Sequence, residues 1–116
     1  MVPSLFSDNN YICGGDIVDN GFVFPSNALA YNNSIDCVWT IQRSDIFTLK
    51  FKRFDVENCT SCQCDYLQLG DGRICGNDLP NDYVSAGGDA LKLQFHSDGS
   101  ISGSGFEFEV ISEKGN

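Results

Sequence analysis

Hydrophobic and polar residues alternate along several short stretches of this chain. The clearest are Phe47–Phe51, Leu91–His96 and Phe106–Val110, in each of which every second residue is apolar. A period of two places the apolar side chains on one face of a β-strand, which is typical of a sheet that covers a core on one side. Shorter apolar runs at Cys37–Ile41 and Tyr66–Leu69 are predicted to be strands as well, with Trp39 and Ile41 facing the core.

Residues that favour turns separate these strands. Asp71-Gly72 is predicted to close a hairpin, and Ser97–Gly105 is too rich in glycine for the interior of an element. Near the start, residues 17–23 predict one short strand broken at Asn20-Gly21. No window of helical length has an apolar stripe with a period of 3.6 residues. Many short strands with turns about every eight to twelve residues predict an all-β sandwich or jelly roll.

Length and charge narrow the class of protein. A chain of 116 residues with 41% hydrophobic residues is expected to form one domain with a core. Seven Lys and Arg stand against sixteen Asp and Glu, so the net charge is −9. Nucleic acids and anionic membranes are therefore poor partners, and cations or basic side chains of another protein are better ones. No stretch approaches the length of a transmembrane span.

Cysteine content indicates an oxidising compartment. Six Cys in so short a chain, with glycosylation sequons at Asn32-Asn33-Ser34 and Asn58-Cys59-Thr60, predict a secreted or extracellular protein. The first residues lack the basic start and apolar stretch of a signal peptide, so we expect the domain to lie within a longer secreted protein. The expected divisions are a polar arm over residues 1–12, the folded domain over 13–111 and a tail over 112–116.

Two carboxylates are expected to meet at one end of the sheet. If the strand ending near Val56 pairs antiparallel with the run that starts at Tyr66, Glu57 and Asp65 lie at the same end. Carboxylates so close repel each other unless a cation or a proton lies between them. The competing interpretation is that these acids are simple turn formers in solvent.

A set of short motifs follows in order along the chain. They are Cys13-Gly14-Gly15, Cys37-Val38-Trp39-Thr40-Ile41, Phe54-Asp55-Val56-Glu57, Cys62-Gln63-Cys64-Asp65-Tyr66-Leu67, Asp71-Gly72, Cys75-Gly76, Phe95-His96-Ser97-Asp98 and Gly105-Phe106. This ordered set resembles the CUB domain over about residues 13–111. The resemblance implies an antiparallel β-sandwich of two five-stranded sheets in a jelly-roll topology, stabilised by disulfides, and acting as a non-catalytic extracellular module.

The resemblance also implies a Ca²⁺ site. Its acidic ligands would be Glu57, Asp65 and Asp98, completed by carbonyls and water around Ser100. Ca²⁺ is a hard cation that takes six to eight oxygen ligands, and so open a site predicts a Kd of about 10⁻⁴–10⁻³ M. Two neighbouring acids are left out of this set: Asp55 is assigned to solvent and Asp71 to a turn.

This chain departs from the family pattern at two places. The family usually has Tyr at the position of Cys64, and often Tyr-Pro at the position of Phe24-Pro25. A tyrosine hydroxyl that steadies a metal ligand or a partner is therefore expected to be missing. Glycosylation is expected at Asn32 rather than Asn58, because a sugar on Asn58 would crowd the metal ligands.

Six cysteines allow fifteen disulfide pairings. The resemblance implies Cys13–Cys37 and Cys62–Cys75, which leaves Cys59–Cys64. The rival arrangement joins Cys59–Cys62 and Cys64–Cys75. A zinc site made by the last four cysteines is disfavoured, since structural zinc uses paired C-x₂₋₄-C knuckles and the chain is expected outside the cell.

The sequence leaves three hypotheses about the function of this chain. The leading hypothesis is a protein-binding module in which Ca²⁺ orders the loops of Glu57, Asp65 and Asp98, and a partner's Lys or Arg enters among these carboxylates. The second is a metal-independent assembly module, or a carbohydrate binder similar to spermadhesins. Its sugar-stacking face would be Phe22, Phe24 and Tyr31, for which packing in the core or a loop is the competing interpretation.

Catalysis is the third hypothesis, and the sequence contains no arrangement of residues that supports it. His96 is the only histidine, and the strand pattern places it on a polar face in solvent. Ser97 and Asp98 follow it directly, but neighbours along a strand point to opposite faces and cannot form a relay. No phosphate loop or catalytic metal motif is present.

Overall fold

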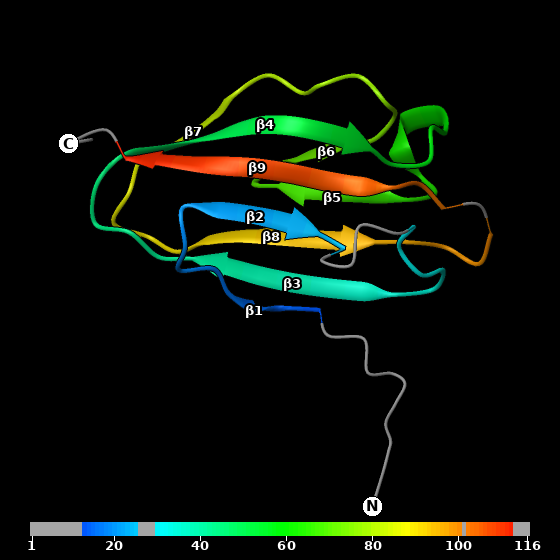
Figure 1. Cartoon of the computed structure of the whole chain (residues 1–116), viewed down its shortest axis with the longest axis horizontal. Coiled ribbons are helices and arrows are strands. Elements are labelled where there is room, and N and C mark those ends of the chain that lie inside the picture. The colour runs from blue at the N-terminus through cyan, green and yellow to red at the C-terminus, as the bar shows by residue number, and fades with distance from the viewer. Residues whose placement is uncertain (1–12, 26–29, 101, 113–116) are drawn as a thin grey trace, which may run out of the picture.

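The computed structural model describes residues 13–25, 30–100 and 102–112, and it shows two β-sheets packed face to face (Figure 1). Among these residues no helix is long and apolar enough to cross a bilayer. A single 3₁₀ turn, η1 (Thr60–Cys62), accompanies the strands. The strands are β1 (Gly15–Asp16), β2 (Gly21–Phe24), β3 (Asp36–Ile41), β4 (Phe47–Asp55), β5 (Tyr66–Leu69), β6 (Gly72–Ile74), β7 (Tyr83–Ser85), β8 (Leu91–His96) and β9 (Gly105–Ser112).

Strand order confirms the predicted all-β sandwich. One sheet has the order β1-β3-β8-β5-β6 and the other the order β2-β9-β4-β7. The predicted antiparallel pairing of the strand that ends near Val56 with the strand that starts at Tyr66 is therefore wrong, because β4 and β5 lie in different sheets. All neighbouring strands are antiparallel except β1, which pairs parallel with β3. The second sheet thus has four strands in the described part of the chain, where the family resemblance implied five.

The strand predicted over residues 17–23 is a strand only from Gly21 onward, where it forms part of β2, and β1 precedes the predicted range. β1 lies at the edge of the five-stranded sheet, and β2 pairs with β9 in the other sheet. Between them the amide of Ile17 still donates to the carbonyl of Thr40 at 2.9 Å. The chain then crosses from one sheet to the other, because the two strands find different long-range partners.

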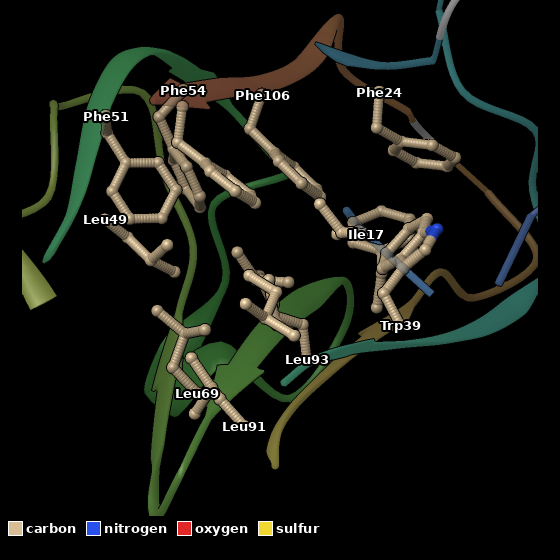
Figure 2. Close-up of a cluster of buried hydrophobic side chains, with 14 of the residues drawn as sticks. Ile17, Phe24, Trp39, Leu49, Phe51, Phe54, Leu69, Leu91, Leu93 and Phe106 are labelled. Atoms are coloured by element: carbon tan, nitrogen blue, oxygen red, sulfur yellow. The ribbon is translucent and has the colours of Figure 1, made fainter. Parts of the chain in front are cut away.

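The core lies between the sheets and is rich in aromatic rings. Apolar residues of β4 and β8 alternate with more exposed ones, as their period of two predicts. Trp39 and Ile41 are buried as predicted, while Val38 between them is exposed. Figure 2 shows Phe24, Trp39 and Phe106 gathered at one end of this core, and Phe24 and Trp39 have their ring centroids 5.1 Å apart. Each such fully buried side chain contributes about 1.5–3 kcal/mol to folding.

The strand directions bring several loops to one end of the sandwich. β4 and β8 end there and β5 and β9 begin there, on the right of Figure 1. Tyr66 pairs with His96 and Asp55 pairs with Gly105 at this end. Residues that directly follow β4 and β8, or precede β5, must therefore lie near one another.

All six cysteines form disulfides: Cys13–Cys37, Cys59–Cys64 and Cys62–Cys75. These are the pairs that the resemblance implied, rather than the rival arrangement. Cys59–Cys64 encloses η1 and lies between the end of β4 and the start of β5. Because every cysteine sulfur is part of a disulfide, no thiolate is left to hold zinc.

Candidate functional site

Three carboxylates meet at this end of the sandwich, and we call Glu57, Asp65 and Asp98 the acidic rim. Glu57 follows β4, Asp65 precedes β5 and Asp98 follows β8. The amide of Asp98 donates to Asp65 Oδ1 at 2.8 Å, so these two ligand candidates are in direct contact. One carboxylate oxygen of Glu57 lies within 4.8 Å of one of Asp98.

Glu57 is held by its backbone but not by its side chain. The preceding residue, Val56, exchanges two backbone hydrogen bonds with Gly76, at 3.0 and 2.8 Å. The amide of Glu57 donates to the hydroxyl of Tyr31 at 3.0 Å. Its Oε1 is inaccessible to solvent and has no hydrogen-bond partner in the described part of the chain. A buried polar atom without a partner is costly, so this oxygen can accept a hydrogen bond or a cation that the described residues do not supply.

Asp65 is completely buried and is hydrogen-bonded through both oxygens. Oδ2 accepts the hydroxyl proton of Tyr31 at 2.5 Å, and Oδ1 accepts from the amide of Asp98. These bonds offset the cost of burying a charge. A carboxylate has about four lone-pair sites, so two remain for a further ligand.

Asp98 is positioned by the loop before β3 and by its own loop. Its carbonyl accepts from the amide of Ser34 at 2.7 Å, and its Oδ1 accepts from the amide of Ser100 at 3.2 Å. Ser100, predicted to help complete a metal shell, is exposed beside Asp98. Short polar loops fold in this way because Asp and Ser satisfy nearby backbone groups with their side chains.

The rim is electrostatically unfavourable by itself. Burial raises the pKa of the Glu57 carboxyl above its ordinary value, and repulsion from Asp65 and Asp98 raises it further. Burial, together with the hydrogen bond to Asp65, also raises the pKa of the Tyr31 hydroxyl well above its ordinary range. A cation among these oxygens would offset the repulsion from Asp65 and Asp98 that contributes to the raised pKa of Glu57.

A sulfur atom lies beside the carboxylates but does not suit a hard cation. Cys64 Sγ is within 4.8 Å of the nearest oxygens of Glu57 and Asp98. It is bonded to Cys59, however, so it carries no negative charge. Soft sulfur ligands suit zinc or copper rather than calcium, and the chemistry of this site is therefore that of oxygen donors.

Sequence reasoning missed the role of Tyr31, whose hydroxyl contacts the rim although the residues at Cys64 and Phe24 predicted that a tyrosine hydroxyl would be missing. Tyr31 lies in the loop before β3, yet only 2% of it is exposed, and its ring packs edge-on against Phe95, with centroids 4.8 Å apart. Its hydroxyl joins Asp65 and Glu57. The one available signal was an aromatic residue standing alone in a polar, Asn-rich segment.

The proposed sugar-stacking face is wrong. Only 3% of Phe24 is exposed, and Tyr31 is buried as well. Phe22 is half-buried and packs against Trp39, with ring centroids 5.1 Å apart. These aromatic rings are occupied inside the domain and do not present a stacking surface.

The prediction that Asp55 simply faces solvent is wrong. Its Oδ2 accepts from the amide and the hydroxyl of Ser104, both at 2.9 Å. Arg53 Nη1 donates to the carbonyl of Ser104 at 2.8 Å. Asp55 thus fastens the end of β4 to the start of β9, whereas Asp71 is exposed in the β5–β6 turn as predicted.

His96 has partners that the strand pattern did not predict. Its Nδ1 lies 2.7 Å from Asp36 Oδ1, and its ring stacks on Tyr66 with centroids 5.3 Å apart. On the Tyr66 ring lies the guanidinium of Arg73, 3.9 Å from the ring centre. These four side chains form a row across the outer face of the five-stranded sheet.

Known proteins resemble this chain over most of its length. The sequence model of the CUB domain family matches residues 13–109. Rat cubilin is 34% identical over 116 residues, covering 90% of this chain and 3% of that protein. Human tumor necrosis factor-inducible gene 6 protein is 31% identical over 112 residues, covering 85% of this chain and 40% of that protein. The chain therefore spans a minor part of these relatives.

Solved structures share the fold at lower identity. The CUB1-EGF-CUB2 domain of human MASP-1/3 has a TM-score of 0.74 and 23% identity, covering 86% of this chain and 42% of that one. The MASP-1 CUB2 domain bound to Ca²⁺ has a TM-score of 0.71 and 22% identity, covering 85% of this chain and 98% of that one. With its sandwich, its three disulfides and the family match over residues 13–109, this chain belongs to the CUB domain family.

Proposed function

We propose that this chain is a non-catalytic, extracellular protein-binding module with a Ca²⁺ site at the acidic rim. Glu57, Asp65 and Asp98 would supply carboxylate oxygens, and the backbone and water around Ser100 would complete the set. The observation that carries the proposal is the buried Oε1 of Glu57, which has no partner in the described structure although two other carboxylates lie beside it.

The residues present suit calcium. The rim offers oxygen atoms from three separate loops, which matches a cation that takes six to eight oxygens in flexible geometry. Both oxygens of Asp65 keep lone pairs after their hydrogen bonds to Tyr31 and Asp98. The MASP-1 CUB2 structure, which shares this fold, is of a Ca²⁺-bound domain.

The protein itself would hold the rim in place for a partner. When bound, Ca²⁺ would neutralise part of the repulsion among the carboxylates. Tyr31 fixes Asp65 and the backbone of Glu57, and Asp65 fixes the backbone of Asp98. The remaining negative charge of the rim attracts a Lys or Arg of a partner, and ordered ligand groups lower the entropy cost of binding.

Asp98→Ala tests this proposal. Removing this carboxylate is expected to abolish measurable binding of CaCl₂ in isothermal titration calorimetry and the rise in Tm that CaCl₂ causes in the wild type. A short lysine-containing peptide should lose its calcium-dependent binding to the same variant. The fold should survive, because the structural contact of Asp98 with Asp65 uses its backbone amide.

Asp89→Ala is the matched control, since Asp89 is an exposed acid in a turn outside the rim. It should bind Ca²⁺ as the wild type does. No heat and no change in Tm when CaCl₂ is added to the wild type would reject the proposal.

Glycosylation is proposed at the two sequons. Asn32 and Asn58 are both exposed, as an acceptor must be. Asn58 directly follows Glu57 of the rim, whereas Asn32 precedes the loop that contacts Asp98. We therefore keep Asn32 as the preferred acceptor, and mass spectrometry of glycopeptides from a secreted preparation would identify which site carries a sugar.

A further inference from the structure

A hollow of about 350 Å³ opens beside the acidic rim. Its walls are residues 55–58 at the end of β4, Asn77 after β6, and residues 102–103 before β9. Glu57 belongs to both the rim and the hollow. A side chain that reaches the rim from the partner therefore has this hollow next to it.

The walls of the hollow carry hydrogen-bond acceptors and no cationic side chain. Asp55 and Glu57 contribute carboxylates, and Asn58 and Asn77 contribute amide oxygens. Asn58 and Asn77 are exposed, and their side-chain amides make no hydrogen bond to other described residues. They are available to a ligand that donates several hydrogen bonds at once.

Hydrogen bonds and close packing hold the walls of the hollow together. Ser104 holds the carboxylate of Asp55, and Arg53 in turn directs its guanidinium to Ser104. Gly103 packs so closely that an added Cβ would lie 2.4 Å from the carbonyl oxygen of Asp55. Asn77 follows Gly76, whose backbone pairs with Val56 on the opposite wall. The acceptors thus stand on segments tied to one another.

We propose that this hollow binds the guanidinium group of an arginine on the partner and prefers it to the ammonium group of a lysine. The inference rests on the proposed function and specifies which basic residue the partner presents. A guanidinium has five N–H donors in a planar fork, whereas an ammonium is a compact point charge with three donors. Acceptors on several walls of the hollow suit the planar fork of a guanidinium better than the point charge of an ammonium.

Titration with two small probes tests this preference. N-acetyl-arginine methylamide and N-acetyl-lysine methylamide are added to the ¹⁵N-labelled protein in CaCl₂, and amide chemical shifts are followed. We expect the arginine probe to bind more tightly and to move signals of residues 55–58 and Asn77. Asn77→Ala should weaken the arginine probe by a factor of about 2–10, the effect of one lost hydrogen bond, and the lysine probe less.

Two further variants separate specific loss from damage to the fold. Asn81→Ala removes an exposed asparagine outside the hollow and should leave both probes unchanged. Asn77→Asp keeps an acceptor of the same size and should restore arginine binding. Equal affinity for the two probes, or the same affinity for arginine in the Asn77→Ala and Asn81→Ala variants, would overturn the inference.

Calcium titrations of the same samples separate this inference from the proposed function. Asn77→Ala should bind Ca²⁺ as the wild type does, because Asn77 is not in the rim. If the wild type binds Ca²⁺ but shows no preference for arginine, only the hollow is assigned wrongly. If the wild type binds no Ca²⁺, the proposed function fails instead.

Discussion

Tyr31 joins the end of β4 to the start of β5 at the rim. Its hydroxyl donates to Asp65 and accepts from the amide of Glu57, residues 34 and 26 positions away. Because Asp65 is fully buried, removing one of its donors leaves a carboxylate oxygen without a partner. One hydroxyl therefore contributes both to stability and to the position of two ligand candidates.

Tyr31→Phe is expected to lower the free energy of unfolding by about 1–3 kcal/mol, the cost of an unsatisfied buried group, in urea denaturation. Loss of a group that orients metal ligands should also lower the affinity for Ca²⁺ by about tenfold or more, measured by calorimetry. Tyr66→Phe is the control, since its ring contacts His96 and Arg73 without a hydroxyl contact in the described structure. Equal Ca²⁺ affinity in the two variants would contradict the role of Tyr31.

At the scale of elements, the loop before β3 is fastened to the end of β8. Ser97 is fully buried, and its hydroxyl donates to the carbonyl of Asn32 at 2.7 Å and accepts from the amide of Ile35 at 3.1 Å. Its amide donates to the carbonyl of Ile35 at 2.9 Å. The ligand candidate Asp98 is the next residue, so this junction determines where Asp98 lies.

Ser97→Ala removes both hydroxyl contacts and leaves the backbone contact in place. We expect unfolding to become easier by about 1–3 kcal/mol and Ca²⁺ affinity to fall, measured well below the Tm where the variant stays folded. The exposed Ser44 provides a matched Ser→Ala control. A variant that is less stable but binds Ca²⁺ with unchanged affinity would show that Ser97 stabilises the fold without positioning Asp98.

At the scale of the whole molecule, disulfides close loops of different length. Cys13–Cys37 spans 24 positions and joins the chain before β1 to β3. Cys59–Cys64 spans 5 positions within the loop between Glu57 and Asp65. By the chain-entropy model the longer loop restricts the unfolded state more, so the two bridges have different roles.

Replacing both cysteines of one bridge by Ser separates these roles. Loss of Cys13–Cys37 should lower the free energy of unfolding by about 3 kcal/mol, and loss of Cys59–Cys64 by about 2 kcal/mol, in urea denaturation. Only loss of Cys59–Cys64 should weaken Ca²⁺ binding, since it constrains the backbone between two ligand candidates. A larger effect of Cys13–Cys37 on Ca²⁺ affinity would contradict this division.

The sequence by itself determined the longer strands, the faces they bury and the end of the sandwich at which Glu57 and Asp65 lie. Alternation along Leu91–His96 and Phe106–Val110 depends only on the geometry of a strand, so it predicts the inner face without knowledge of the partner strand. Glu57 and Asp65 do lie at one end, but the predicted pairing of their strands is wrong. β4 and β5 belong to different sheets, and the two acids meet because β4 ends and β5 begins at the same end of the sandwich (Figure 1).

Only the tertiary structure decided which distant groups meet. The pattern over residues 17–23 did not show that the strand begins only at Gly21, or that β2 joins a different sheet from β1, which precedes it. The partners of Tyr31, Asp55 and His96 lie 34, 49 and 60 positions away in Asp65, Ser104 and Asp36. A periodic pattern reports the local orientation of a side chain, whereas a hydrogen bond across the sandwich depends on the packing of the whole domain.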